Sequence, residues 1–197
     1  KGRGFGKRIG SLSIESLKEE GYENITLLNY LLNIGSSNDV IAEKDIEALV
    51  SNFNLKNISS SSPKFSKEVL TSLNKDMLQS YNSHEISFRL IEINKNLPED
   101  KLWGFVKNNI NFFLEIKNWI EVINSENNVS EKNIDKSFLD IAIETLPKEP
   151  FNEDTWNTWT NHIKNKTGLK GKDLFMPLRI ALTGKNKGPE LKYLLPL

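Results

Sequence analysis

Cysteine is absent from this chain of 197 residues, and histidine occurs only twice, at His84 and His162. Without cysteine, disulfides, thiol nucleophiles and cysteine-ligated zinc sites are excluded. The two histidines lie far apart and lack metal-ligand spacing, so the sequence predicts no bound metal. No apolar run approaches the roughly 20 residues of a transmembrane helix, and no signal peptide opens the chain. We therefore expect a cytoplasmic protein that does not contact a membrane.

The formal net charge of the chain is zero, but the charged residues are unevenly distributed along it. Residues 1–14 hold four cations and no acid, and residues 155–197 hold eight cations and two acids, so the middle is acidic. Basic ends suit a protein that touches a polyanion at two places. Ordinary fluctuation of solvated surface charge gives the same pattern, and charge alone leaves both explanations open.

Apolar side chains recur three or four residues apart through most of the chain, which predicts an all-α fold. Ser13, Ser66 and Asn152 have the residue types that cap helix N-termini. A serine-rich stretch ending at Pro63 is typical of a linker or turn, and residues 54–59 favour a short extended piece. We expect helices over residues 13–21, 24–34, 43–53, 66–81, 84–97, 98–123, 130–145, a stretch after Asn152, 173–183 and 188–195.

A basic, glycine-rich segment near the start, residues 4–14, is the first candidate for chemistry. Its glycines allow close approach of the backbone to a ligand, and Lys7 and Arg8 carry charge that neutralises phosphate. A helix N-terminus, which favours anions, follows this segment. The spacing is not that of the Walker phosphate loop. A phosphate site and a flexible, solvated end both remain possible from these residues alone.

The segment from Lys170 to Gly184 is the second candidate, because it combines cations with Phe175, Pro177 and Arg179. Phe175 and Pro177 form a candidate apolar platform for an unstacked base, and aromatic stacking contributes about 1–3 kcal/mol per base. The planar fork of Arg179 matches a phosphate or a base edge. Cations for the nucleic-acid backbone are Lys170, Lys172, Lys185 and Lys187. Core positions are expected at Trp103, Phe112, Phe113, Trp119, Trp156, Trp159, Ile163, Leu174, Leu178, Ile180 and Leu182.

These two segments carry a resemblance to a known family. Residues 5–14 resemble the Leu-Ser-Lys-Arg form of the class I synthetase KMSKS loop. Residues 174–191 resemble the Leu-Phe-x-Pro-Leu-Arg-x-Ala-Leu-Thr-Gly and Gly-Pro-Glu-Leu signatures of bacterial-type glutamyl-tRNA synthetases. Further landmarks follow in the same order over essentially the whole chain: Glu20-Gly21-Tyr22, Asn29 to Gly35, Phe65, Leu70, Leu73, Asn74 and Leu78.

The resemblance implies an all-α architecture in which a stem-contact helical region precedes a two-part helical-bundle anticodon-binding domain. The implied divisions are residues 1–60, with the KMSKS-type loop, then 61–126 and 127–197. The implied function is recognition of tRNA(Glu) by part of an enzyme that joins L-glutamate to tRNA with ATP and Mg²⁺. Lys7 takes the catalytic ATP-phosphate role, with Arg8 beside it, although Gly6 stands where the family has serine. Implied anticodon-binding residues are Lys170, Lys172, Phe175, Pro177, Arg179 and Lys187.

No HIGH-like motif of a class I catalytic domain occurs in the sequence, so we expect the C-terminal part of a synthetase. Such a piece is expected to be monomeric, inactive by itself and free of bound cofactor. One alternative is a helical protein-interaction module without RNA binding, which the zero net charge and acidic middle favour. Another is a parent enzyme that also charges tRNA(Gln). Salt-dependent RNA binding separates the first alternative from tRNA recognition.

Overall fold

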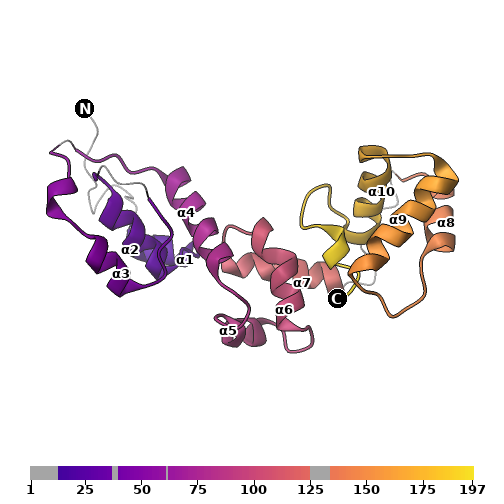
Figure 1. Cartoon of the computed structure of the whole chain (residues 1–197), viewed down its shortest axis with the longest axis horizontal. Coiled ribbons are helices and arrows are strands. Elements are labelled where there is room, and N and C mark those ends of the chain that lie inside the picture. The colour runs from indigo at the N-terminus through magenta and orange to yellow at the C-terminus, as the bar shows by residue number, and fades with distance from the viewer. Residues whose placement is uncertain (1–12, 37–39, 61, 125–133) are drawn as a thin grey trace. The chain divides into compact units, whose positions relative to one another are not determined.

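A computed structural model of the chain describes residues 13–36, 40–60, 62–124 and 134–197 (Figure 1). Every regular element in these residues is helical, so the predicted all-α class is confirmed. The predicted extended piece at residues 54–59 amounts to one isolated antiparallel bridge between Ser36 and Ile58. Contacts divide the chain into two compact units. Unit 1 comprises Lys1–Tyr81 and Ile110–Glu115, and unit 2 comprises Asn82–Asn109 and Ile116–Leu197.

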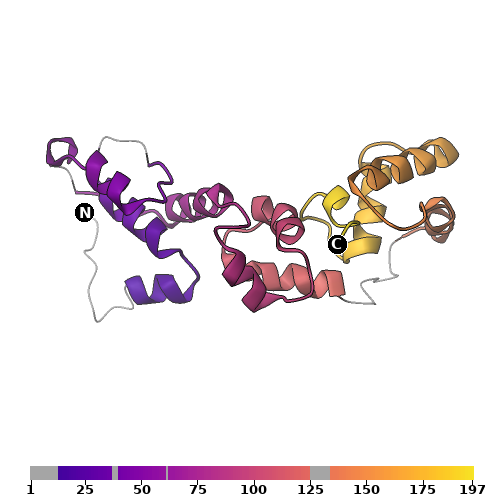
Figure 2. The same ribbon diagram turned by 60° about the horizontal axis from the view of Figure 1, so that its bottom comes forward.

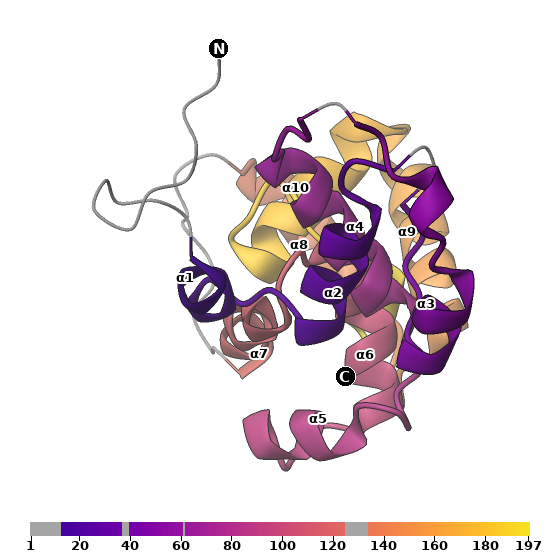
Figure 3. The same cartoon turned by 90° about the vertical axis from the view of Figure 1, so that its left-hand side faces the viewer.

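Unit 1 contains the helices α1 (Ile14–Glu19), α2 (Asn24–Asn33), α3 (Ile46–Asn52) and α4 (Lys67–Ser80), with the 3-10 turn η1 (Leu55–Asn57). Predicted caps at Ser13 and Ser66 are confirmed, since each side chain accepts a hydrogen bond from the backbone three residues on. Figure 3 shows α2 beside α4. Their shared core, with α1, consists of Leu17, Tyr22, Leu27, Tyr30, Leu70 and Leu73.

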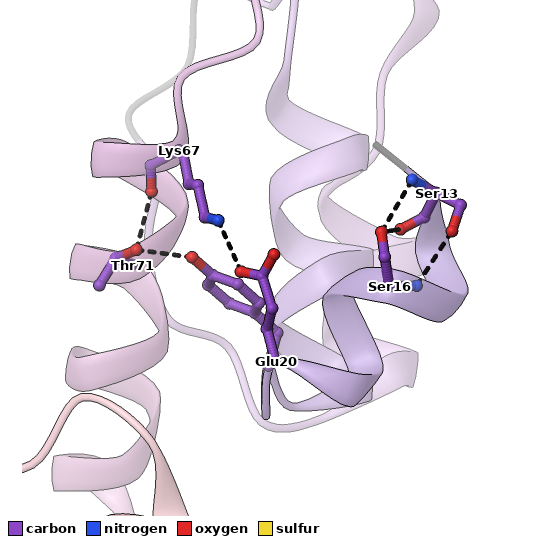
Figure 4. A network of polar contacts seen from close by, with 6 residues as sticks. Ser13, Ser16, Glu20, Lys67 and Thr71 are labelled. Atoms are coloured by element: carbon purple, nitrogen blue, oxygen red, sulfur yellow. Dashed lines mark hydrogen bonds and ion pairs between the residues drawn. The ribbon is translucent and has the colours of Figure 1, made fainter. Parts of the chain in front are cut away.

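Polar contacts fasten α4 to the chain around α1 (Figure 4). The Lys67 ammonium lies 2.7 Å from a carboxylate oxygen of Glu20, and this hydrogen bond raises the pKa of Lys67 above its ordinary value. One turn further along α4, the hydroxyls of Thr71 and Tyr22 are 2.7 Å apart. An exposed ion pair such as Lys67–Glu20 contributes little, so the buried leucines supply most of the stabilisation of α4.

The single helix predicted over residues 98–123 is wrong. The structure has α6 (Glu99–Val106), two 3-10 turns, η2 (Lys107–Asn109) and η3 (Phe113–Glu115), and then α7 (Ile116–Asn124). Helix hydrogen bonding stops because Asn111 binds elsewhere: its N–H donates to Glu115, and its carbonyl accepts from the Asn74 side chain. Phe112 meanwhile packs edge-to-face on Tyr22, with ring centres 5.0 Å apart. The apolar stripe therefore serves two units rather than one long helix.

Unit 2 contains α5 (Ser87–Ile93), α6, α7, α8 (Lys136–Thr145), α9 (Glu153–Thr167), α10 (Lys172–Thr183) and the 3-10 turn η5 (Leu191–Tyr193). The helices α8, α9 and α10 lie together in the orange-to-yellow part of the chain (Figure 2). Their core is formed by Phe138, Ala142, Trp159, Ile163, Leu174 and Leu178, and four of these six were expected core positions.

Several predicted helix ends in unit 2 were wrong. The helix expected to open at Ser130 begins at Lys136 with Asp135 as its cap, and Ser130 lies outside the described residues. The helix expected over residues 84–97 is the shorter α5, and residues 188–195 contain only η5. Asn152 does cap α9, and its side chain accepts from the N–H groups of Asp154 and Thr155.

The two units differ from the three predicted divisions, because α4 belongs to unit 1 although it lies beyond residue 60. The predicted division into residues 1–60, 61–126 and 127–197 concerns contact with tRNA and stays a proposal. It is distinct from the division into two packed units. None of the helices in the described ranges is long and apolar enough to cross a bilayer. Over the same ranges, no group of three acidic, histidine or cysteine side chains is placed to hold a metal ion.

Candidate nucleic-acid interface

The helix α10 carries most of the predicted RNA-binding residues. It begins after Gly171 and ends at Gly184, both with positive φ, at 55° and 65°. Leu174 and Leu178 face the core and are 2% and 1% exposed. These two leucines define the side of α10 that faces the core. On the opposite side of the helix, residues spaced three or four apart share one outward face.

Lys172, Phe175 and Arg179 share that outward face, because they are spaced three and four residues apart. Pro177 is two residues from both Phe175 and Arg179, so it lies on a different side of the helix. It is half-buried and has no N–H for the carbonyl of Asp173. The structure thus separates Pro177 from Phe175, and the two do not form one platform.

Phe175 has a different aromatic partner, Trp156 of α9. The two rings are stacked with an interplanar angle of 28° and centres 6.1 Å apart, and Phe175 remains 42% exposed. Trp156 contacts Trp159 edge-to-face at 5.9 Å, and the Trp159 indole N–H donates to the Ala142 carbonyl at 2.8 Å. The partly exposed stack is therefore fixed from below by a buried, hydrogen-bonded tryptophan.

A depression of about 270 Å³ adjoins this stack. Its lining combines aromatic, cationic and acidic side chains from α9, α10 and the chain around η5. The lining residues are Trp156, Phe175, Arg179, Glu190, Leu191 and Lys192. An apolar ring surface beside cations is the combination that binds an unstacked base together with its phosphate.

Arg179 is half-buried at the edge of this depression. One Nη1–H donates to the carbonyl of Pro189 at 2.9 Å, which ties α10 to the segment before η5. Burial lowers the pKa of Arg179, although a guanidinium remains charged at any ordinary pH. Since a guanidinium has five N–H groups, this bond, which is the one Arg179 makes among the described residues, leaves most of the fork for a ligand.

Lys192 is the second cation at the depression, and its ammonium lies 2.9 Å from a carboxylate oxygen of Glu190. The hydrogen bond from Lys192 to Glu190 raises the pKa of Lys192 most, and the hydrogen bond to Tyr193 raises it further. Glu190 offsets part of the positive charge and orients the ammonium. An approaching phosphate therefore meets a positioned cation with a neighbouring acid rather than a uniformly basic surface.

The structure brings only some of the predicted contact residues together. Lys172, Phe175 and Arg179 share one face, whereas Lys170 and Lys187 are exposed in the loops before and after α10. Lys185 is half-buried, with its ammonium 4.6 Å from the centre of the Trp119 ring. Lys7 and Arg8, predicted to bind ATP, lie outside the described residues.

Four lining residues of the depression were not predicted as site residues from the sequence: Trp156, Glu190, Leu191 and Lys192. Trp156 was expected in the core because it is spaced helically with Trp159 and Ile163, but it is half-buried beside Phe175. Lys192 follows the Gly-Pro-Glu-Leu signature directly, and that adjacency was the available signal for it. The stack between Trp156 and Phe175 joins residues on two helices, which no spacing rule within one helix predicts.

Comparison with known proteins identifies the family of the region that contains the depression. A family profile described as anticodon binding domain matches residues 92–197, which includes all of α10 and the depression. Among solved structures, the glutamate-tRNA synthetase of Elizabethkingia anophelis shares the fold, with TM-score 0.66, 19% identity and coverage of 91% of this chain and 38% of that one. A glutamate tRNA ligase from Elizabethkingia meningosepticum in complex with its amino acid gives TM-score 0.69 and 19% identity, over 96% and 41%.

Curated relatives extend the likeness over the whole chain. Glutamate–tRNA ligase 2 of Rickettsia canadensis is 36% identical over 97% of this chain and 43% of its own length. Glutamate–tRNA ligase 1 of Brucella ovis is 38% identical over 100% of this chain and 44% of the relative. The chain thus spans somewhat less than half the length of these relatives. Because the family profile covers more than half of the chain, the chain belongs to the anticodon binding domain family.

Proposed function

We propose that this chain binds the anticodon arm of tRNA(Glu) as part of a glutamate–tRNA ligase. The observation that carries the proposal is the partly exposed Trp156–Phe175 stack beside Arg179 and Lys192, inside the region that matches the family profile. Proteins read RNA sequence mainly in single-stranded loops, whose bases can be splayed onto aromatic side chains. An anticodon is such a loop, which accounts for the aromatic ring and the guanidinium in one depression.

Each part of the depression has its own role in this proposal. One anticodon base stacks on Phe175, and the free N–H groups of Arg179 donate to a base edge or phosphate. Lys192 neutralises phosphate charge next to that base. Lys170, Lys172 and Lys187 attract the RNA backbone from the two loops and the first turn of α10, without reading sequence. Pro177 shapes the helix and makes no contact with RNA.

The complete enzyme, in this proposal, joins L-glutamate to tRNA(Glu) in the cytoplasm with ATP and Mg²⁺, and works as a monomer. The relatives are glutamate–tRNA ligases, which is the support for this part. ATP supplies the leaving group that activates the glutamate carboxyl. Lys7 and Arg8 are the residues of this chain assigned to the ATP phosphates. Contact with the tRNA stem is assigned to residues 1–60, and contact with the anticodon arm to residues 61–126 and 127–197.

Binding of a fluorescent anticodon stem-loop tests the proposal. We expect the tRNA(Glu) loop to bind more tightly than loops with substituted anticodon bases, and affinity to fall between about 50 and 200 mM salt. The tRNA(Gln) loop serves as the competitor that reports on a non-discriminating parent enzyme. Equal binding of the tRNA(Glu) loop and unrelated loops at low salt would refute anticodon recognition and favour a protein-interaction module.

Substitution of Phe175 locates the contact. Phe175→Ala should weaken stem-loop binding by about tenfold, since stacking contributes about 1–3 kcal/mol per base. Phe88→Ala is the matched control, because Phe88 on α5 is another phenylalanine of unit 2 and is 72% exposed. An equal loss of affinity in both variants would place the RNA contact elsewhere.

A further inference from the structure

We infer that Trp119 of α7 is a positioning residue for the RNA-binding depression. Lys185 helps Trp119 to hold the neighbouring loop and does not bind an RNA phosphate. The inference deepens the proposed function and rests on it. The loop concerned comprises residues 185–189, between the end of α10 and the depression lining at Glu190, Leu191 and Lys192. Its position, together with the packing of η5 on α9, determines where the lining on η5 lies relative to the aromatic stack.

Trp119 is itself firmly held within unit 2. It is 8% exposed and packs edge-to-face on Phe105 of α6, with ring centres 5.8 Å apart and an interplanar angle of 83°. Phe105 is 2% exposed. The indole therefore presents a surface whose place is fixed by the core beneath it, as a positioning group requires.

Lys185 lies on that surface. Its ammonium is 4.6 Å from the centre of the Trp119 ring, within the range of a cation–π interaction. Thr183 fixes the backbone of the same residue, since the Lys185 N–H donates to the Thr183 hydroxyl at 3.2 Å. A half-buried lysine held at both ends is poorly placed to follow an RNA phosphate.

Gly188 brings the backbone of the loop against the same indole. A Cβ added at Gly188 would run into Cη2 of Trp119, so a residue without a side chain is required there. Its φ of +149° is a second reason for glycine. The next residue, Pro189, is buried, and its carbonyl accepts the hydrogen bond from Arg179.

The loop is therefore held between two groups, Trp119 on α7 and Arg179 on α10. The residues that follow it directly, Glu190 to Lys192, form the η5 side of the depression. Loss of the indole should let the loop shift, which moves Lys192 away from the Trp156–Phe175 stack. Trp119 thus acts on RNA through the loop and without touching RNA.

The first experiment compares Trp119→Leu with Trp119→Phe. Because the Lys185 ammonium lies 4.6 Å from the Trp119 ring centre, the ring current should shift the Lys185 side-chain NMR signals in the free protein, and Trp119→Leu should abolish that shift. We expect Trp119→Leu to weaken tRNA(Glu) stem-loop binding by about tenfold, and Trp119→Phe to recover most of the affinity, because a phenyl ring retains cation–π attraction. Trp103→Leu, at another buried tryptophan of unit 2, on α6, is the control for lost stability.

The second experiment separates positioning from phosphate contact at two neighbouring lysines. Each lost phosphate contact reduces the slope of log affinity against log salt by about 1. Lys187→Gln should therefore reduce the slope, whereas Lys185→Gln should lower affinity with the slope unchanged. An equal reduction of slope in both variants overturns the assignment of Lys185.

The third comparison uses two glycines with positive φ. Gly188→Ala meets the Trp119 ring, whereas Gly168, with φ +73°, has open space around the position of its Cβ. The stem-loop affinity of Gly188→Ala should therefore be about tenfold lower than that of Gly168→Ala, since the clash displaces the loop that leads to Lys192.

The outcomes keep this inference apart from the proposed function. If the wild-type chain does not prefer the tRNA(Glu) loop, the proposed function fails. The NMR shift of Lys185 still reports the contact between Lys185 and Trp119. If the wild-type chain binds but Trp119→Leu keeps the stem-loop affinity, the positioning role fails alone, even where the Lys185 shift is lost. If Trp103→Leu weakens binding as much as Trp119→Leu, the effect is one of stability and the inference is overturned.

Discussion

Asn74 is a fully buried polar side chain of unit 1 that binds two backbone groups. It is 0% exposed, accepts from the Glu23 N–H at 2.8 Å and donates to the Asn111 carbonyl at 2.6 Å. Asn74→Leu should lower the free energy of unfolding by about 2–4 kcal/mol, because two backbone groups lose their partners in a buried place. Urea unfolding followed by circular dichroism measures the change.

Thr26 supplies the contrasting case. It is also 0% exposed, but among the described residues its hydroxyl is buried without a hydrogen-bond partner. Thr26→Val should leave stability unchanged or raise it by up to about 1 kcal/mol, since no bond is lost and a desolvated hydroxyl is removed. A loss as large as that of Asn74→Leu would show that packing, and not hydrogen bonding, sets the cost at both sites.

Arg179 has two roles, and a conservative substitution can measure them separately. The sequence predicted an RNA contact, and the structure adds the bond to Pro189. Arg179→Lys keeps the charge but loses the planar fork, so stem-loop affinity should fall by about tenfold. Stability should fall by about 1 kcal/mol as the Pro189 carbonyl loses its donor. Unchanged affinity with the same stability loss would make Arg179 purely structural.

Elements formed by neighbouring residues were predicted well. Caps at Ser13, Ser66 and Asn152 follow from hydrogen bonds that span two or three residues, so the sequence alone predicts them. The break after α6 was missed because it depends on Asn74, which lies 37 residues before its partner Asn111. In the candidate site, the face of Phe175 and Arg179 follows from helical spacing, whereas the stack on Trp156 requires the packing of α9 on α10.

Pro177 offers a prediction at the level of the helix α10. Its position inside the helix leaves the Asp173 carbonyl without the usual donor. Pro177→Ala restores that donor and should raise the free energy of unfolding by about 1 kcal/mol, the helical gain being offset partly by a freer unfolded chain. Stem-loop affinity should stay within about twofold of the wild type, since residue 177 does not share the outward face. A loss of stem-loop affinity as large as that of Phe175→Ala would show that Pro177 contacts RNA.

On the scale of the whole molecule, the chain forms two units with separate cores. The core around Tyr30 belongs to unit 1, and the core around Trp159 belongs to unit 2. All four tryptophans of the sequence lie in the segments of unit 2. Tryptophan fluorescence therefore reports the unfolding of unit 2, whereas circular dichroism reports the helices of both units.

This arrangement predicts separable unfolding. Asn74→Leu removes bonds within unit 1, so the midpoint seen by circular dichroism should move to lower urea while the fluorescence midpoint changes little. Asn152→Ala, which removes the cap of α9 at a cost of about 1 kcal/mol, should shift the fluorescence midpoint instead. Coincident shifts of both probes in both variants would show one cooperative transition. In that event the chain connection through Ile110–Glu115, a segment of unit 1 that lies in the sequence between α6 and α7 of unit 2, would be enough to make the two units unfold together.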